Sequence, residues 1–127
     1  MYSGTAILKY YKTWIIAWTD PEIGRYYFSW IPKSQYPQQQ MRPSHITVVR
    51  MAPIEIPTKT DVWGKYQDRI ISFTYDGLIH FQHPYFYLDV WSDDIGKIRK
   101  ELGLQKFREG YGSYHITIGN IKSQEIR

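Results

Sequence analysis

The stretch YHITI at positions 114–118 carries the pattern from which the fold of this chain can be predicted, and SHITV at positions 44–48 repeats it seventy residues earlier. In both copies a histidine, an apolar residue, a threonine and a second apolar residue alternate. This is the two-residue period of a β-strand, so the histidine and the threonine share one face and the apolar side chains share the other. Each strand therefore buries one face and presents two polar groups on its opposite face.

The two copies supply four candidate catalytic residues, His45, Thr47, His115 and Thr117. If the copies lie on neighbouring strands, both imidazoles and both hydroxyls converge on one small volume. One imidazole can then accept a proton while the other donates one, because the ordinary pKa of histidine lies near 6.5. The threonine hydroxyls can donate hydrogen bonds to phosphoryl oxygens. The alternative is that the histidines are structural and that the threonines reflect strand propensity.

Through these two motifs the chain resembles the 2H phosphoesterases, a family named for two His-x-Thr/Ser-x motifs on the central strands of a bilobal α+β fold. The resemblance implies metal-independent cleavage of a phosphodiester by two-histidine acid–base catalysis. The compact length is similar to that of a phage-encoded branch, the anti-CBASS nucleases, which destroy the cyclic oligonucleotide signals of bacterial anti-phage defence. The resemblance therefore implies a hydrolase that cuts 3′–5′ linkages in a cyclic di- or trinucleotide.

By the family mechanism, one histidine would deprotonate a ribose 2′-hydroxyl and the other would protonate the departing 5′-oxygen, leaving a 2′,3′-cyclic phosphate. The sequence leaves open which histidine has which role. Two other functions stay open as well. One is an RNA-end 2′,3′-cyclic phosphodiesterase similar to the RNA-ligase-like branch, and the other is a non-catalytic nucleotide-binding module or sponge. We expect a cytoplasmic protein, in the host cytoplasm if a phage encodes it.

Outside the motifs, we expect one α+β domain over residues 1–127, with the compact bilobal architecture, antiparallel sheets and two helices. β-Branched and aromatic residues predict strands. They fall at residues 5–10, 13–18, 25–30, 70–75, 78–82 and 85–90. Asp76 and Gly77 predict a hairpin between two of these strands. The polar stretch at residues 34–40, which contains Pro37, predicts a long loop.

Two segments carry helix signals. The stronger helix is capped by Ser92 or Asp93 and ended by Gly103, and its apolar residues recur on one face. The weaker helix covers residues 60–69 and contains Gly64, which costs about 1 kcal/mol relative to alanine in a helix interior.

The composition excludes several kinds of chemistry. The chain has no cysteine, which removes disulfides, thiolate nucleophiles and cysteine-ligated zinc. Lys9 and Lys12 interrupt any leader-like apolar run, and no apolar stretch approaches the about 18 residues that span a bilayer. His80 and His83 lie three apart and would point to opposite faces of a strand, and no cofactor fingerprint is present. We therefore expect no metal, no cofactor and no membrane partner.

Charge and aromatic content suggest the kind of ligand. Sixteen Lys and Arg against twelve Asp and Glu give a net charge of +4, which suits a small anionic ligand without a basic tail for duplex nucleic acid. Aromatic residues make up 17% of the chain, and exposed rings can stack on bases. Tyr11, Trp14 and Trp63 are the expected substrate-binding residues, although each could instead belong to the core.

Overall fold

Strands dominate the computed structural model, which describes residues 1–51 and 54–122. In this part of the chain there are eight strands and two short α-helices, joined by short 3-10 turns and loops. The strands are β1 (Tyr2–Tyr10), β2 (Trp14–Trp18), β3 (Pro37–Gln39), β4 (His45–Arg50), β5 (Ile70–Tyr75), β6 (His80–Gln82), β7 (Tyr85–Trp91) and β8 (Tyr114–Ile121). The helices are α1 (Pro21–Phe28) and α2 (Asp93–Glu101).

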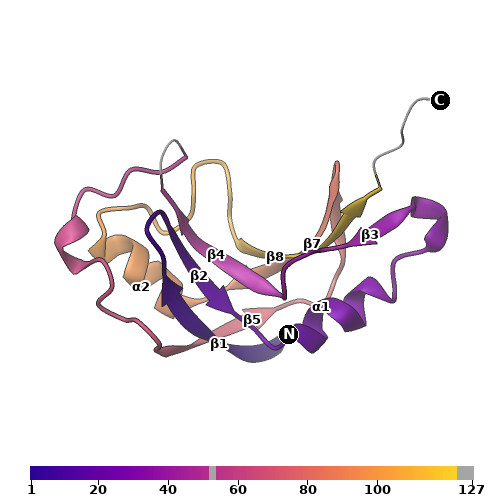
Figure 1. Ribbon diagram of the computed structural model, residues 1–127, viewed down its shortest axis with the longest axis horizontal. Helices are drawn as coiled ribbons and strands as arrows, with labels where there is room; N and C mark the ends of the chain where they lie inside the picture. Colours follow the sequence, from indigo (N-terminus) through magenta and orange to yellow (C-terminus); the bar gives the residue numbers. More distant parts are fainter. Residues whose placement is uncertain (52–53, 123–127) are drawn as a thin grey trace.

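Six of these described strands close into an antiparallel barrel, in the order β8-β4-β2-β1-β5-β7, with β7 pairing back to β8. β3 extends the sheet beside β8, and β6 extends it beside β7. Figure 1 shows β4, β8 and β7 side by side, with α2 and α1 toward opposite ends of the molecule. The expected bilobal α+β architecture is therefore wrong, because the fold is mostly β. β8 has strand partners along both of its edges. Closing the barrel therefore gives hydrogen-bond partners to backbone N–H and C=O groups that would stay unpaired at the edges of two separate sheets.

The barrel interior holds the hydrophobic core. Each of β1, β2, β4, β7 and β8 contributes fully buried large side chains there, among them Leu8, Ile15, Ile46, Leu88 and Ile116. Residues that alternate with these along β4, β7 and β8 face the opposite side of the sheet. The strands predicted over residues 5–10, 13–18, 70–75 and 85–90 are all confirmed, to within three residues at their ends.

The predicted helix after β7 is also confirmed, as α2. Its N-cap is Ser92, whose Oγ accepts a hydrogen bond from the Ile95 backbone N–H at 3.2 Å. Gly103 follows the helix with a φ of +78°, a left-handed conformation that favours glycine. The apolar face of α2 joins the core.

The weaker helix predicted over residues 60–69 does not form. A single 3-10 turn over Thr60–Val62 is followed by turns. Gly64 has a φ of +89° and Asp68 a φ of +66°. Both values are left-handed and incompatible with a continuous right-handed helix, so the chain turns there instead.

The strand predicted over residues 25–30 is wrong, because most of this segment lies in α1. Asp20 caps the helix by accepting a hydrogen bond from the Glu22 backbone N–H at 3.0 Å. Pro21 occupies the start of the helix, where its missing N–H has no intrahelical partner to lose. These two start signals outweigh the strand preference of the aromatic residues that follow.

Two turn and loop predictions also need correction. β5 and β6 do not pair with each other, since both pair with β7. Asp76 and Gly77 therefore lie in a connection between two strands that pair, one after the other, with the same edge of β7, the edge opposite β8, rather than in a hairpin. The polar stretch at residues 34–40 is not entirely loop: it contains β3, which pairs with the end of β8. Among the described residues, no helix combines the length and the apolar content needed to cross a membrane.

Candidate active site

The two His-x-Thr motifs lie on paired strands. β4 and β8 run antiparallel with Ile46 opposite Ile116. In this register His45 lies opposite Thr117 and Thr47 opposite His115, all on the face that points away from the barrel interior. The two motifs therefore lie on neighbouring strands, which is the condition under which the sequence brings their four polar side chains together.

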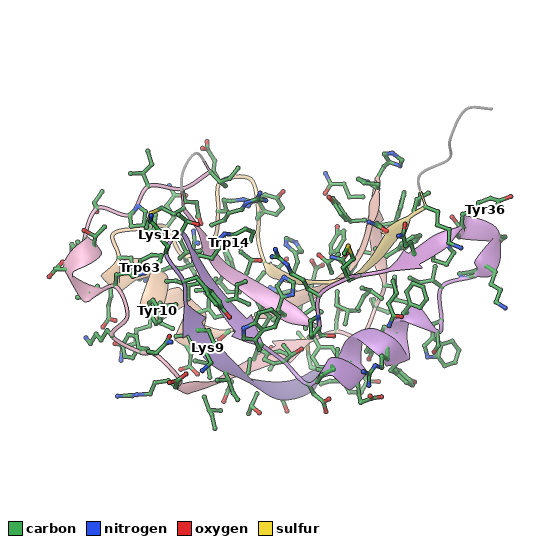
Figure 2. The ribbon with its side chains drawn as sticks, viewed as in Figure 1. Lys9, Tyr10, Lys12, Trp14, Tyr36 and Trp63 are labelled. Atoms are coloured by element: carbon green, nitrogen blue, oxygen red, sulfur yellow. The ribbon has the colours of Figure 1, made fainter. Side chains whose placement is uncertain are left out.

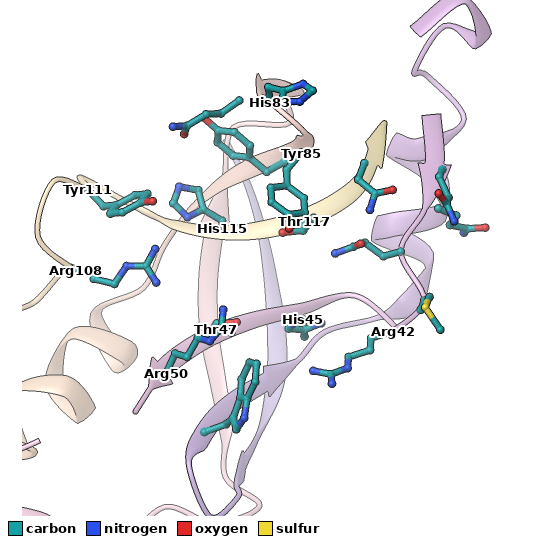
Figure 3. Close-up of a pocket in the computed structure, with 18 residues that line it drawn as sticks. Arg42, His45, Thr47, Arg50, His83, Tyr85, Arg108, Tyr111, His115 and Thr117 are labelled. Carbon is teal, nitrogen blue, oxygen red and sulfur yellow. The ribbon is translucent and has the colours of Figure 1, made fainter. Parts of the chain in front are cut away.

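The four motif side chains line one cavity of about 680 Å³. Figure 3 shows His115 and Thr117 on one strand facing His45, Thr47 and Arg50 across this space. The side chains are half-buried, so they are held by the sheet and still reach solvent. The cavity is therefore accessible to a small ligand that could touch both motifs at once.

The strand register also places motif residues opposite particular residues of β7 and β2. Thr117 lies opposite Tyr87 on β7, and His115 lies opposite Asp89 on the same strand. On the far side of β4, His45 lies opposite Trp18 of β2. Each motif histidine therefore has a fixed neighbour on the strand beyond it.

His45 is held by two contacts. Its Nδ1 lies 2.9 Å from the carbonyl oxygen of Pro43, and its ring centroid lies 5.2 Å from that of Trp18. A carbonyl oxygen can only accept, so Nδ1 must carry the proton in this hydrogen bond. In the neutral ring, Nε2 then has a free lone pair and can accept a proton.

His115 has a more polar and more enclosed environment. Its Nε2 lies 3.6 Å from Oδ1 of Asp89, and the hydroxyl of Ser113 donates to the same oxygen at 2.8 Å. The rings of Tyr87 and Tyr111 meet the imidazole edge-on, with centroids at 4.9 and 5.2 Å. Burial lowers the pKa of His115 from its ordinary value of 6.5, and the Asp89 carboxylate opposes this change.

The cavity walls are cationic. Arg42, Arg50 and Arg108 line it, and none of its described lining residues is an aspartate or a glutamate. Trp14, one of the expected substrate-binding residues, also lines the cavity, and its ring lies 5.0 Å from the guanidinium carbon of Arg50 and 5.5 Å from that of Arg42. Trp14 therefore positions two arginines through cation–π contacts. The site as a whole suits an anionic ligand.

Tyr11 and Trp63, the other two predicted substrate-binding residues, do not line the cavity. Trp63 donates from Nε1 to the carbonyl oxygen of Tyr11 at 3.1 Å and packs edge-on against Tyr10. Figure 2 shows Trp63 and Tyr10 together in one part of the molecule, away from Tyr36. The hydroxyl of Tyr11 accepts a hydrogen bond from Nε1 of Trp18 at 3.0 Å. Because Trp18 packs against His45, Tyr11 helps to hold His45 in place indirectly, through its hydrogen bond with Trp18.

One group of side chains near the site has the composition of a metal-ligand set. Asp76, His80 and Asp89 each bring one possible ligand atom to within 4.8 Å of the others. The Nε2 of His80 lies 3.2 Å from Asp89 and 3.4 Å from Asp76. The contact with Asp76 is a hydrogen bond, and Asp89 lies within ion-pair distance of the same nitrogen. His83 lies apart from it and lines the cavity.

Sequence reasoning missed several contributors to the site, among them Asp89, Arg108 and Tyr111. Asp89 follows alternating residues of a strand, so its face could be predicted, but its proximity to His115 depends on the pairing of β7 with β8. Arg108 and Tyr111 lie in the loop before β8 and reach the cavity from there. Their only sequence signal is that they come shortly before the second motif.

Comparisons with known proteins give no relative: no family model, no curated protein and no solved structure matches this chain.

Proposed function

We propose that this protein is a phosphodiesterase that cleaves 3′–5′ linkages of cyclic di- or oligonucleotides, with His45 and His115 as the acid–base pair. The observation that carries the proposal is the antiparallel pairing of the two His-x-Thr motifs within one cavity. Diagonal neighbours on one face of a sheet have side chains about 7–8 Å apart. A phosphodiester, with its attacking and leaving oxygens, can bridge that separation.

His45 is the general base in this proposal. Its Nδ1–H donates to the Pro43 carbonyl oxygen, which fixes the tautomer and directs the lone pair to Nε2. Contact with Trp18 holds the ring orientation. A base must approach its proton with defined geometry, and His45 is the motif histidine whose ring is fixed by a hydrogen bond to the backbone.

His115 is the general acid. The Asp89 carboxylate lies 3.6 Å from its Nε2 and stabilises the imidazolium form. Burial lowers the pKa of His115, which makes the imidazolium a stronger proton donor once it has formed. The negative charge of a bound phosphodiester would favour that protonated form further.

The remaining polar groups act on the phosphoryl oxygens. Thr47 and Thr117 can donate hydrogen bonds to the non-bridging oxygens, whose charge grows as phosphorus becomes five-coordinate. Arg42, Arg50 and Arg108 supply fixed positive charge from the same cavity. Hydroxyls and guanidiniums held by the fold stabilise that charge without reorganising during the reaction.

In the proposed reaction one bond forms as another breaks, and the two histidines accept and donate the protons that move. The 2′-oxygen forms a bond to phosphorus as the P–O5′ bond breaks, the 2′-hydroxyl proton passes to Nε2 of His45, and a proton from His115 passes to the 5′-oxygen. The products are a 2′,3′-cyclic phosphate end and a free 5′-hydroxyl. Water can open the cyclic phosphate by the reverse use of the same two groups.

A small nucleotide fits the site better than a long duplex. The cavity of about 680 Å³ lies in the range of small-molecule sites, roughly 300–1,000 Å³. Its arginines complement the paired phosphates of a cyclic dinucleotide. We accordingly propose cyclic-nucleotide defence signals as the substrates, with phage-encoded evasion of host defence as the biological setting.

The test is incubation of the purified protein with cyclic di- and trinucleotides and with an RNA that ends in a 2′,3′-cyclic phosphate, with products identified by mass. We expect cleavage of a cyclic nucleotide that persists with chelator present. His45→Ala and His115→Ala should each lower the rate by about 100-fold or more, with the fold checked by circular dichroism. Preference for the RNA end would indicate an RNA-processing enzyme, and recovery of intact ligand would indicate a binding module. Retention of most activity in a folded histidine variant would contradict the proposed mechanism.

A further inference from the structure

A series of four titratable side chains leads from His115 away from the cavity. Nε2 of His115 lies 3.6 Å from Oδ1 of Asp89, and Oδ2 of the same carboxylate lies 3.2 Å from Nε2 of His80. Nε2 of His80 also forms a hydrogen bond with Oδ2 of Asp76 at 3.4 Å. Of these four residues His115 lines the cavity, so the other three can act on a ligand only through it.

His80 contacts both of the β7 side chains that flank His115. It lies opposite Tyr87 in the pairing of β6 with β7, and the two rings stack with centroids 5.5 Å apart and planes at 27°. Tyr87 in turn meets the imidazole of His115 edge-on. The strand pairing, the Tyr87 ring and the hydrogen bond to Asp76 therefore hold the ring of His80 in one place beside Asp89.

The Nε2 atom of His80 carries a proton. Both groups that face this nitrogen are carboxylates, and an ionised carboxylate can only accept a hydrogen bond. The hydrogen bond to Asp76 therefore requires an N–H at Nε2, whether the ring is neutral or charged. Since Oδ2 of Asp89 lies 3.2 Å from the same nitrogen, the positive end of that N–H bond lies close to the negative charge of Asp89.

The Asp89 carboxylate is shared between two histidines. Its Oδ1 accepts a hydrogen bond from the Ser113 hydroxyl and faces His115, whereas its Oδ2 faces His80. A donor beside a carboxylate offsets part of its charge, so the carboxylate stabilises the imidazolium of His115 less strongly. Burial has the largest effect on the pKa of His115 and lowers it, Asp89 raises it, and Arg108 and His80 lower it.

The other polar groups around His115 come from β4 and from the loop before β8, and Figure 3 shows several of them around the cavity. They are His45, Thr47, Arg108, Tyr111 and Ser113. These residues are unchanged in every variant proposed below. A difference in His115 between those variants therefore reports on His80 and Asp89.

We propose that His80 is a positioning residue that shares the Asp89 carboxylate with His115 and limits how tightly that carboxylate holds the proton of His115. Without His80, the full negative charge of Asp89 would act on His115, which would then be a weaker proton donor. The inference rests on the proposed function for the role that it gives His115. The ionisation of His115 itself can be measured without a substrate.

NMR titration of the imidazole signals tests the proposal directly, with chelator present. The His115 signals are followed against pH in the wild-type protein, His80→Leu, His80→Gln, Asp89→Asn and the double variant His80→Leu with Asp89→Asn. Leucine removes the N–H, whereas glutamine keeps a side-chain N–H. Thr74→Leu is the matched control, because Thr74 is an exposed residue of β5, which pairs with the same edge of β7 as β6 does. His80 is half-buried on a terminal strand of the sheet, and His80→Ala serves if leucine prevents folding.

We expect the titration midpoint of His115 to rise by roughly 0.3–0.7 pH unit in His80→Leu, and by less in His80→Gln. The midpoint should fall in Asp89→Asn, and adding His80→Leu to that variant should then raise it by less than half as much as in the wild-type background. Thr74→Leu should leave it unchanged. An unchanged or lower midpoint in folded His80→Leu, or an equally large rise in the Asp89→Asn background, would overturn the proposal.

Cleavage of a cyclic dinucleotide by the same samples reports separately on the proposed function. The falling limb of kcat/KM should move to higher pH in His80→Leu, opposite to its movement in Asp89→Asn. The expected shift of the His115 midpoint without any cleavage would uphold the role of His80 beside Asp89 and count against the phosphodiesterase. Cleavage with an unshifted midpoint in His80→Leu would do the reverse.

Discussion

Ile46 on β4 lies directly opposite Ile116 on β8, and a local two-fold axis through this pair relates the two His-x-Thr motifs. Because both isoleucines are fully buried, they hold the register from inside the barrel. A shift of one residue would move the histidines into the core and the isoleucines into the cavity. The chemistry on the outer face therefore depends on packing on the inner face, and the following predictions use that dependence.

Removing a motif hydroxyl should impair catalysis without loss of fold. Thr47→Val and Thr117→Val should each lower kcat on the order of 100-fold, because a fixed donor to the phosphoryl oxygens is lost. Thr74→Val is the matched control, since Thr74 is an exposed strand threonine on β5. Steady-state kinetics on a cyclic dinucleotide measures the effect. Equal activity in all three variants would mean that the motif threonines serve only as strand formers.

Replacing Asp89 should change the pH dependence of the rate. His115 must be protonated to act as the acid, so the rate falls as pH rises through its pKa, which lies below 6.5. Asp89 raises that pKa, so Asp89→Asn should move the falling limb of kcat/KM to lower pH. Asp61→Asn, which removes an exposed carboxylate elsewhere, should leave the limb in place. A limb that stays fixed or moves to higher pH in Asp89→Asn would refute the pairing.

The same pKa makes folding stability depend on pH. Since the pKa of His115 is lower in the folded chain than the unfolded value of 6.5, the unfolded state binds more protons between those two values. Stability from this group is complete above 6.5 and is lost as pH falls toward the folded pKa. His115→Gln should therefore lose less in Tm than the wild type between about pH 7.5 and about pH 5. His83→Gln is the exposed control, and an identical loss in wild type and His115→Gln would contradict the prediction.

A buried ion pair contacts β4, the strand that carries the first motif. Arg99 of α2 is only 3% exposed, pairs with Glu55, and donates to the Val48 carbonyl oxygen of β4 at 2.8 Å. Arg99→Leu leaves the buried Glu55 carboxylate with the Arg50 backbone N–H as a donor but without its counter-ion, and should cost about 3–5 kcal/mol in the free energy of unfolding. Urea denaturation measures this, with the exposed neighbour Lys100→Leu as control. The double variant with Glu55→Leu should recover part of the loss, and no recovery would argue against an unpaired charge as the cause.

The cavity arginines should govern substrate affinity and its salt dependence. Arg42→Gln and Arg50→Gln should each raise KM for a cyclic dinucleotide by about tenfold, because a charge-assisted contact to phosphate is lost. The slope of log KM against log salt should also become shallower. Arg69→Gln is the control, since Arg69 lies against Tyr66 and does not line the cavity. An unchanged salt slope in both variants would exclude direct phosphate contacts.

Local sequence patterns predicted much of the secondary structure. The strands around both motifs follow from alternation, and α2 follows from its Ser92 cap and the glycine at 103. Conflicts between local signals were harder to resolve. Aromatic residues at 25–30 favour a strand, yet the Asp20 cap and Pro21 start α1.

The sequence by itself determined which face of each motif strand is polar, because side-chain direction alternates along any strand and needs no partner. Only the tertiary structure decided that β8 pairs with both β4 and β7 and closes a barrel. The pairing of β4 with β8 joins Ile46 to Ile116, which lie seventy positions apart in the sequence. It uses backbone N–H and C=O groups, which nearly every residue carries, so no local sequence pattern specifies it. The pairing of β7 with β8 brings Asp89 to His115, and the pairing of β3 with β8 brings Gln38 to Asn120, which is why those neighbours could not be predicted from the sequence.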